Sequence, residues 1–251
     1  TWCSGVGSDV NAGTDPAFPK ATLTSALAAA GCGSTIRVDK GTYTDDLLDM
    51  TSTHDGVLIT GAGRDATIFD QSGTGDHFME IKSSATNITI SDMTIKDYDE
   101  GDNGGAIDIT SGGSSITLED INFDNNKATA SQAHGGAVYI NSSSTVTLNR
   151  CSFTNNQVQG NNSSTHGSSI YSEGTVTIQN CLFYDNICTY TADNGHVHIE
   201  NGTATIVNCT FTENGAGIPL YIYDGSSHTV KNCLFNNNTD SYDIKEGNTY
   251  P

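Results

Sequence analysis

The sequence predicts an all-β fold: a single-stranded right-handed parallel β-helix, or solenoid, with a short N-terminal capping α-helix. Three observations support this prediction. A motif of about eight residues recurs along the chain, apolar and polar residues alternate within it, and only 16% of the residues are charged while Gly, Ser, Thr and Asn abound. The spacing of the motif varies although its residues do not, which is typical of stacked coils whose loops differ in length.

The N-terminal segment differs from the rest and is expected to cap the solenoid. Residues 19–30 read as a helix that ends at Gly31, and residues 35–38 and 41–43 read as the first strands. An open coil exposes unpaired strand edges, which solenoids cover with atypical terminal units. We therefore expect a single domain over residues 1–251. It comprises a cap and first coil at 1–45, stacked coils at 46–238 and a C-terminal end at 239–251.

The recurring motif forms the body of the chain. Its copies are residues 88–95, 116–123, 146–153, 176–183, 204–211 and 228–235. The alternation within each copy predicts two short strands around a bend. A further strand is expected near residues 105–109, 136–140, 168–171, 195–199 and 220–223. Three strands in each coil, stacked in register, make a parallel β-helix.

Stacking places equivalent residues above one another, so three internal ladders are expected. The first is of cysteines that follow Ile121, the second of phenylalanines and the third of asparagines at a tight turn. Their members are Cys151, Cys181, Cys209 and Cys233; Phe123, Phe153, Phe183, Phe211 and Phe235; and Asn126, Asn156, Asn186, Asn214 and Asn238. We interpret all three as structural. Parallel cysteines on neighbouring coils do not converge on one metal ion, and Cys188 lies outside the ladder with no evident role.

The charge of the chain limits its partners. Ten Lys and Arg against 29 Asp and Glu give a net charge of −19, which repels nucleic acid and anionic membranes. No apolar run is long enough for membrane insertion. The acidic stretch 97–102 could bind Ca²⁺, but its residues lack the spacing of a calcium loop, so a solvated turn and no cofactor are expected.

An exported protein is expected, because the chain begins at Thr1 without an initiator Met, as after removal of a signal peptide. In an oxidising compartment Cys3 and Cys32 could form a disulfide that fixes the N-terminus. Asn-X-Ser/Thr sequons are about as frequent as chance predicts and indicate little about glycosylation. They lie at Asn87, Asn141, Asn161, Asn162, Asn201, Asn208 and Asn237.

Two parts of the chain resemble known families. The Ala-rich helix followed by residues 34–38 and 40–43 resembles the first coil of the pectin-lyase-like β-helix superfamily. The segments Gly104-Gly-Ala-Ile and Gly135-Gly-Ala-Val, each followed by Phe-X-X-Asn, resemble the GGA[ILV] and FxxN repeats of polymorphic outer-membrane-protein-type adhesins. This second likeness covers residues 104–238.

These resemblances leave several functions open. Many pectin-lyase-like proteins act on polysaccharides, but the sequence shows no acid series of the polygalacturonase kind, and only Arg37, Arg64 and Arg150 supply guanidinium. The best local candidate for a metal site is formed by His166, His196 and His198, with His134 nearby, although solvated histidines are commoner than ligands.

We therefore expect a non-enzymatic structural or adhesive protein, secreted or at the cell surface, that serves as a subunit of an extracellular filament or coat. Its expected partners are further copies of itself, other surface proteins or glycans. A polysaccharide-binding or polysaccharide-degrading enzyme is the first alternative. An ice-binding protein is the second, because an outward Thr-X-Thr row recurs at 145/147, 175/177 and 203/205 and as Ser115/Thr117 in the coil before. The flanks Asn87/Thr89 and Ser227/Thr229 break the pattern.

Overall fold

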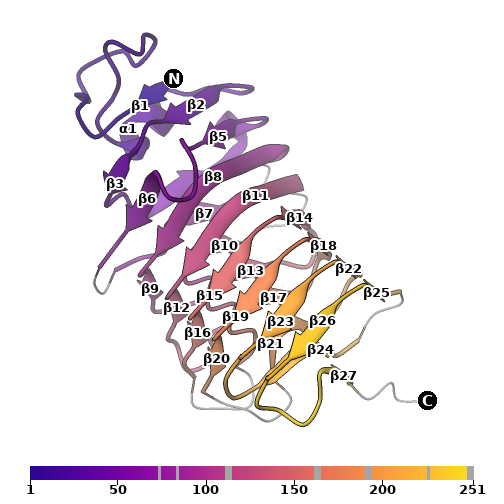
Figure 1. Ribbon diagram of the computed structural model, residues 1–251. Coiled ribbons are helices and arrows are strands. Elements are labelled where there is room, and N and C mark those ends of the chain that lie inside the picture. The colour runs from indigo at the N-terminus through magenta and orange to yellow at the C-terminus, as the bar shows by residue number, and fades with distance from the viewer. Residues whose placement is uncertain are drawn as a thin grey trace.

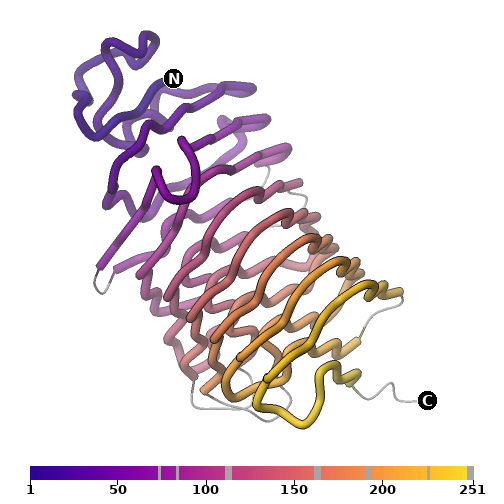
Figure 2. The backbone as a smooth tube through the Cα atoms, in the orientation of Figure 1, coloured from indigo at the N-terminus to yellow at the C-terminus, as the bar shows by residue number. Residues whose placement is uncertain are grey.

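The computed structural model shows a parallel β-solenoid whose coils stack from the N-terminus to the C-terminus (Figures 1 and 2). It describes residues 1–72, 75–82, 85–110, 115–160, 165–189, 194–224 and 227–247. All strand pairs in this part of the chain are parallel, and each strand pairs with its equivalent in the neighbouring coils. The all-β parallel solenoid predicted from the repeats is confirmed.

Three sheets run along the solenoid. Sheet A consists of β1 (Trp2–Cys3), β2 (Thr35–Val38), β3 (Gly41–Tyr43), β5 (Leu58–Thr60), β6 (Thr67–Asp70), β8 (Ile88–Lys96), β11 (Ser115–Asp124), β14 (Thr145–Asn149), β15 (Ser152–Thr154), β18 (Thr175–Gln179), β19 (Leu182–Tyr184), β22 (Ala204–Val207), β23 (Thr210–Thr212), β25 (Thr229–Lys231) and β26 (Leu234–Asn236).

Sheet B consists of β4 (Leu48–Met50), β7 (Met79–Ile81), β10 (Ile107–Ile109), β13 (Val138–Ile140), β17 (Ile170–Ser172), β21 (Gly195–Ile199), β24 (Ile218–Ile222) and β27 (Ile244–Glu246). Sheet C is the narrow sheet of β9 (Asp99–Glu100), β12 (Lys127–Ala128), β16 (Gln157–Val158) and β20 (Ile187–Cys188).

Sheet A bends in the middle of each coil. The bend residue has a positive φ, and Asp, Asn or Arg occupies it: Asp120 lies inside the continuous β11 at φ 52°, and Arg150 separates β14 from β15 at φ 54°. Asn and Asp tolerate this conformation better than other side chains do. Arg150 is held outward by ion pairs to Glu119 and Asp120, each at 2.7 Å.

The core repeats from coil to coil. The ring centroids of Phe123, Phe153, Phe183, Phe211 and Phe235 lie 4.6 to 4.9 Å apart in one stack. Cys151, Cys181 and Cys209 are buried in a parallel column, whereas Cys233 and Phe235, in the last coil, are only partly buried. Val230, in the same coil, is also only partly buried. The apolar core is therefore more exposed at the C-terminal end of the described solenoid than in the coils before it.

The asparagine column closes the turn between sheets A and C. Asn156 Nδ2 donates to the Phe123 carbonyl at 3.0 Å, and its Oδ1 accepts from the backbone N–H of Asn126 at 3.0 Å. Asn186, Asn214 and Asn238 repeat the two bonds, one coil on each time. A buried turn whose backbone groups would otherwise lack partners is satisfied in this way.

The N-terminal helix is shorter than expected. α1 spans Leu23–Ala28 rather than residues 19–30, because the Thr22 side chain accepts a capping bond from Ser25 N and fixes the start. Lys20, two residues before this cap, forms a parallel bridge with Cys3 and is not helical. A short 3₁₀ turn, Ser52–His54, follows β4. The helix still buries Leu23, Ala26 and Leu27 against the first coil.

The predicted disulfide between Cys3 and Cys32 is wrong, since both thiols are free. Cys3 pairs with Val38 in the strand register and points into the core, where it is fully buried. Cys32 lies in the exposed turn after α1, with its Sγ against the carbonyls of Ser52 and Thr53. The two side chains therefore face different environments.

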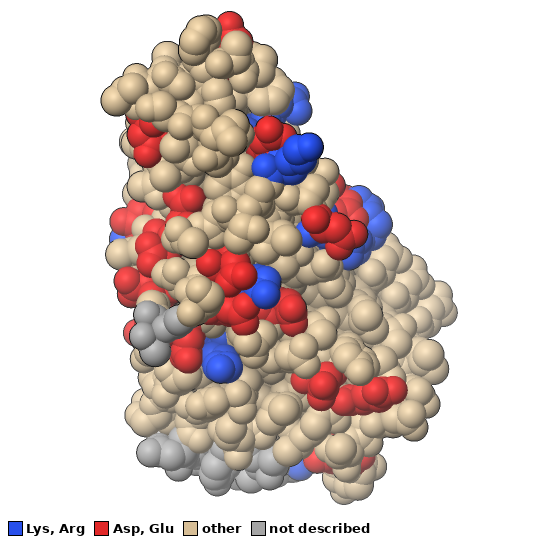
Figure 3. Space-filling model, turned by 60° about the vertical axis from the view of Figure 1, so that its left-hand side comes forward, with Lys and Arg blue, Asp and Glu red and all other residues tan. Residues whose placement is uncertain are grey.

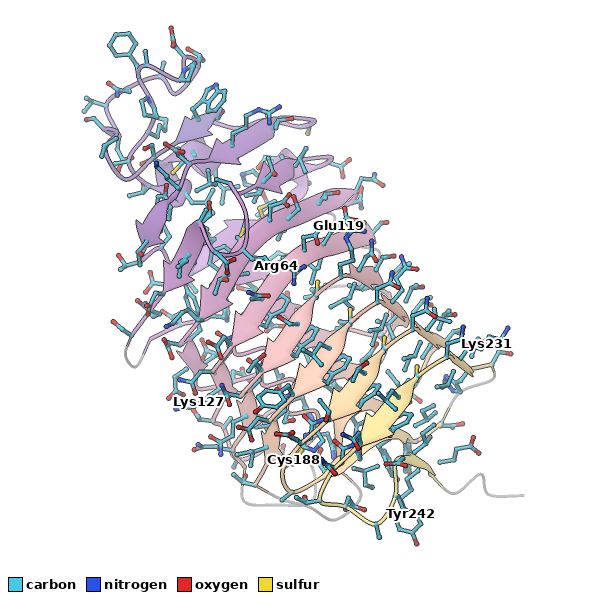
Figure 4. The ribbon with its side chains drawn as sticks, in the orientation of Figure 1. Arg64, Glu119, Lys127, Cys188, Lys231 and Tyr242 are labelled. Carbon is cyan, nitrogen blue, oxygen red and sulfur yellow. The ribbon has the colours of Figure 1, made fainter. Side chains whose placement is uncertain are left out.

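The threonines on the outer face of sheet A stack in register. Thr89, Thr117, Thr147, Thr177, Thr205 and Thr229 form one column. This column is longer than the sequence indicated, because its flanking members Thr89 and Thr229 continue it. Figure 4 shows Arg64 and Glu119 on the N-terminal part of this same face, Lys127 and Cys188 along sheet C, and Lys231 and Tyr242 on opposite sides of the last coil.

Candidate active site

One row of outward-facing residues crosses every strand of sheet B, and we call it the sheet-B row. Each member pairs in register with the next, while the inward neighbours, such as Ile107 and Val138, lie in the core. The members are Asp49, Glu80, Asp108, Tyr139, Tyr171, His198, Tyr221 and Lys245. At about 4.8 Å between neighbouring strands, the row is about 34 Å long.

Asp108 is the most unusual group in the row. Only 8% of the residue is exposed, and its Oδ1 atom is buried without a hydrogen-bond partner among the described residues. Burial, and after it the charges of Glu80, Asp102 and Glu100, raises the pKa of Asp108 to about 8. Asp108 is therefore a protonated carboxylic acid at neutral pH.

The Gly104–Gly105 turn contributes to this burial. Gly104 has a φ of +64° and lies so close to Asp108 that an added Cβ would stand 2.8 Å from the Asp108 Cα. A side chain at this position would also be strained by the left-handed backbone. The glycine pair thus allows the loop to pack directly against the strand that carries the acid.

Glu80 lies beside Asp108 on the neighbouring strand but in a different environment. Its Oε1 accepts a hydrogen bond from Thr110 Oγ1 at 3.2 Å, and its Oε2 lies 3.1 Å from Lys82 Nζ. Lys82 Nζ also donates to Asp49 Oδ1 at 2.8 Å, and its hydrogen bonds to Asp49 first and then to Glu80 raise the pKa of Lys82. Two adjacent carboxyl groups thus occupy unlike surroundings, since Asp108 is buried with an unpartnered Oδ1 among the described residues and Glu80 is hydrogen-bonded and ion-paired.

Aromatic and imidazole rings form the C-terminal half of the row. Centroid distances are 5.7 Å between Tyr139 and Tyr171, 5.4 Å between Tyr171 and His198, and 4.8 Å between His198 and Tyr221. Tyr171, His198 and Tyr221 are buried, whereas Tyr139 remains partly exposed. These rings form a packed wall whose accessible part is next to Asp108.

Two loop histidines cover the wall. His134 stacks on Tyr171 at 4.2 Å, and His166 stacks on His198 at 4.3 Å. Burial, with a smaller contribution from the charge of His166, lowers the pKa of His134 to about 4. His198 Nε2 lies 2.9 Å from Glu200 Oε2. His134 is therefore a neutral imidazole at neutral pH and acts as a stacking surface.

The metal candidates His166, His196 and His198 are not brought together as ligands. The rings of His166 and His198 are stacked at an interplanar angle of 29°, so their nitrogens do not point to one ion. His196 instead contacts Ser168 Oγ at 2.7 Å and the Gly217 carbonyl at 3.1 Å. Within the described ranges, no group of three His, Cys, Asp or Glu residues could hold a metal.

The acidic stretch 97–102 likewise fails to converge. Asp97 pairs with Lys96 at 2.9 Å, Asp99 and Glu100 form β9, and Glu100 contacts His77 at 3.4 Å. Asp102 is exposed. These contacts point the carboxylates in different directions, unlike those of a calcium loop.

Cys188 packs in a second, small apolar cluster with Ala128, Ala133 and Val158. Its Sγ lies 3.8 Å from His196 Nδ1, and burial raises the pKa of the Cys188 thiol to about 12. A protonated buried thiol is a poor nucleophile. Cys188 therefore supports the loops beside sheet B rather than supplying chemistry.

The sequons differ in exposure. Asn87, Asn201, Asn208 and Asn237 are exposed and Asn141 is partly buried, while Asn161 and Asn162 lie outside the described residues. Glycosylation stays a prediction.

Reasoning from the sequence missed the sheet-B row. The sequence predicted the strands that carry Asp108, Tyr139, Tyr171, His198 and Tyr221, but it did not identify these residues as one row. An ionisable or aromatic residue at the same outward position in successive copies was the available signal. Glu80 lies in an earlier coil that lacks the recognisable repeat, so nothing in the repeats indicated it.

Comparisons with known proteins agree with the fold. The model of the family described as "Right handed beta helix region" matches residues 46–218 and 128–249. No curated protein matches the sequence. None of the helices in the described part of the chain is long and apolar enough to span a membrane.

Among solved structures, a pectin methylesterase from carrot aligns with 99% of this chain and 88% of its own, at 12% identity and a TM-score of 0.49. A rhamnogalacturonan lyase aligns with 91% of this chain at 17% identity and a TM-score of 0.45. The alignment covers 62% of the lyase, less than two thirds of its length. Pectin methylesterase PemA from Erwinia chrysanthemi aligns at 9% identity and a TM-score of 0.34.

These neighbours are enzymes by their titles, which contradicts the expectation that the chain is not an enzyme. The non-enzymatic structural or adhesive role has no support from them either. At these identities and TM-scores the likeness concerns the fold alone and gives neither substrate nor site. The GGA[ILV] and FxxN likeness to adhesins stays a prediction.

Proposed function

The chain belongs to the right-handed β-helix family, and from the chemistry of its sheet-B row we propose that it binds a polysaccharide along this row and cleaves a glycosidic bond beside Asp108. The pairing of a buried, protonated Asp108 with a carboxylate at Glu80 carries the proposal. We further propose that the protein acts outside the cell, where polysaccharides of this kind are found.

The roles follow from the surroundings of the two acids. Asp108 can donate its proton to the oxygen that leaves when the glycosidic bond breaks, because the acid holds that proton at neutral pH. Glu80, held by Lys82 and Thr110, can stabilise the positive charge that develops at the anomeric carbon and accept the proton of the attacking water. The water oxygen then bonds to the anomeric carbon, and both new chain ends are hydroxyl groups.

The length of the row favours a polymer over a small ligand. The stretch of the row from Asp49 to Tyr139, before the buried rings of Tyr171, His198 and Tyr221, spans about 14 Å and can contact more than one sugar unit. Partly exposed rings such as those of Tyr139 and His134 can stack against sugar faces. The acid pair lies toward the N-terminal end of this row. A chain bound across it would place sugars on both sides of the bond to be cleaved.

Release of reducing ends from a panel of polysaccharides tests the proposal. Asp108→Asn and Glu80→Gln should each lower the rate by about 100-fold or more, since each removes one proton-transfer or charge-stabilising group. Glu213→Gln is the matched control, because it removes one carboxylate from an exposed turn after β23, away from sheet B. Equal activity in all four proteins would refute the assigned roles.

A further inference from the structure

Negative charge lines the sheet-B row on both sides of Asp108. One outward position further along each strand, a second row contains Thr110, Asn141, Glu173 and Glu200. Asp102, whose charge acts on Asp108, adds another carboxylate from the loop. Figure 3 shows Asp and Glu gathered over the middle of the neighbouring flank of the solenoid, with few Lys and Arg among them.

The cations near the row are already engaged. Lys82 is bonded to both Asp49 and Glu80. Lys245 lies over the rings of Tyr221 and Tyr242, at 6.0 and 5.7 Å from their centroids. Anions bound by proteins are usually held by Arg or Lys, and neither lysine is placed to hold one.

The arginines lie on the other side of the molecule. Arg64 and Arg150 both contact Asp120 on the outer face of sheet A, at 3.2 and 2.7 Å. Arg37 stacks over the Trp2 ring at 5.8 Å in the first coil. All three therefore lie far from the acid pair in the fold, because sheets A and B face opposite ways across the core.

We infer that the polysaccharide accepted by the sheet-B row is a neutral one, built of sugars without carboxylates or other anionic groups. This inference rests on the proposed function and deepens it by assigning the substrate class. A uronate polymer would bring one negative charge with each sugar against Glu80, Glu173 and Glu200, while the two lysines near these strands, Lys82 and Lys245, already have partners. Hydroxyl groups, by contrast, can donate hydrogen bonds to these carboxylates.

The size of the discrimination follows from simple electrostatics. Two like charges about 4 Å apart repel one another in water, and more strongly near a protein surface. Repeated along several sugars, this repulsion should weaken binding of a uronate chain at least about tenfold relative to an uncharged chain of the same shape. Salt should reduce the difference, because it screens exposed charges.

The test compares homogalacturonan in its fully methyl-esterified and fully de-esterified forms, together with galactan, arabinan and galactomannan, by affinity electrophoresis and calorimetry. We expect binding of at least one uncharged polymer. We also expect at least tenfold weaker binding of the de-esterified polymer at low salt, and a smaller difference at high salt. Equal or tighter binding of the de-esterified polymer overturns the neutral class but leaves the proposed function in place. Binding of none of the polymers overturns the proposed function, and the inference with it.

A pair of charge-reversal variants separates local from overall charge. Glu173→Lys places a cation beside Tyr171, whose hydroxyl now donates to Glu173 Oε1 at 3.3 Å. Glu213→Lys changes the net charge by the same amount on the exposed turn after β23. We expect only Glu173→Lys to gain affinity for the de-esterified polymer, by about tenfold. Equal gains in both variants would show that the overall charge of −19, and not the row, sets the preference.

Discussion

Replacing Asp108 by Asn should change the pH dependence of stability in a calculable way. The pKa of Asp108 is raised from 3.8 to about 8 in the folded protein. A raised folded-state pKa means that the folded state binds the proton more tightly than the unfolded state does, so stability is fully present below about pH 4 and is lost as the pH rises toward 8. Asparagine resembles the protonated acid in shape and cannot ionise.

The magnitude follows from about 1.4 kcal/mol for each pKa unit. The free energy of unfolding of Asp108→Asn, relative to the parent protein, should increase by about 2.4 kcal/mol between pH 4 and pH 6. Between pH 4 and pH 9 it should increase by about 5 kcal/mol. The comparison uses the difference between the two proteins, so the other titrating groups cancel to the extent that they do not interact with Asp108.

Denaturant unfolding at pH 4, 6 and 9, with a ¹³C NMR titration of the Asp108 carboxyl, measures both quantities. Glu80→Gln is the useful second variant, since removing the neighbouring charge should lower the pKa of Asp108 without returning it to 3.8, because burial is the larger cause. A stability difference between Asp108→Asn and the parent that is the same at all three pH values would refute the reasoning.

Three further outcomes follow from the structure. Asn156→Ala should cost about 3 kcal/mol or more of unfolding free energy, because it removes the side-chain hydrogen bonds to the Phe123 carbonyl and the Asn126 N–H in the buried turn. A loss under 1 kcal/mol in denaturant would show that the ladder is dispensable. Phe183→Ala should lower the free energy of unfolding by about 3 to 5 kcal/mol, because it removes a fully buried ring between two stacked neighbours. An unchanged denaturation midpoint would contradict that packing. Thiol labelling of the native protein, measured by peptide mass spectrometry, should modify the exposed Cys32 and should modify the buried Cys3 only after unfolding. A disulfide between Cys3 and Cys32 would contradict the free thiols.

The stacked coils could be predicted because their cause is local and repeated. Every copy of the motif places an apolar pair and a turn residue at the same spacing, and five of the six copies add an asparagine three residues later. One coil therefore dictates the register of the next. The length of α1 was less accessible, since its start depends on one side-chain cap, at Thr22, within a longer Ala-rich run.

The site could not be predicted in the same way. Asp108 appears in the sequence as an ordinary strand residue, and its raised pKa arises only when the Gly104–Gly105 turn and Glu80, from another coil, pack around it. The disulfide failed for a related reason, because two cysteines near each other in sequence can point into different environments. Both outcomes depend on contacts between coils, which the repeat pattern does not specify.

The most direct test of the proposed site is a crystal structure of Asp108→Asn bound to an oligosaccharide of the neutral polymer that binds best. We expect the sugar chain to lie across β7, β10 and β13, with a glycosidic oxygen within hydrogen-bond distance of the side chain at position 108 and a sugar face against Tyr139. A sugar chain bound on the outer face of sheet A, with none on the sheet-B row, would contradict the account.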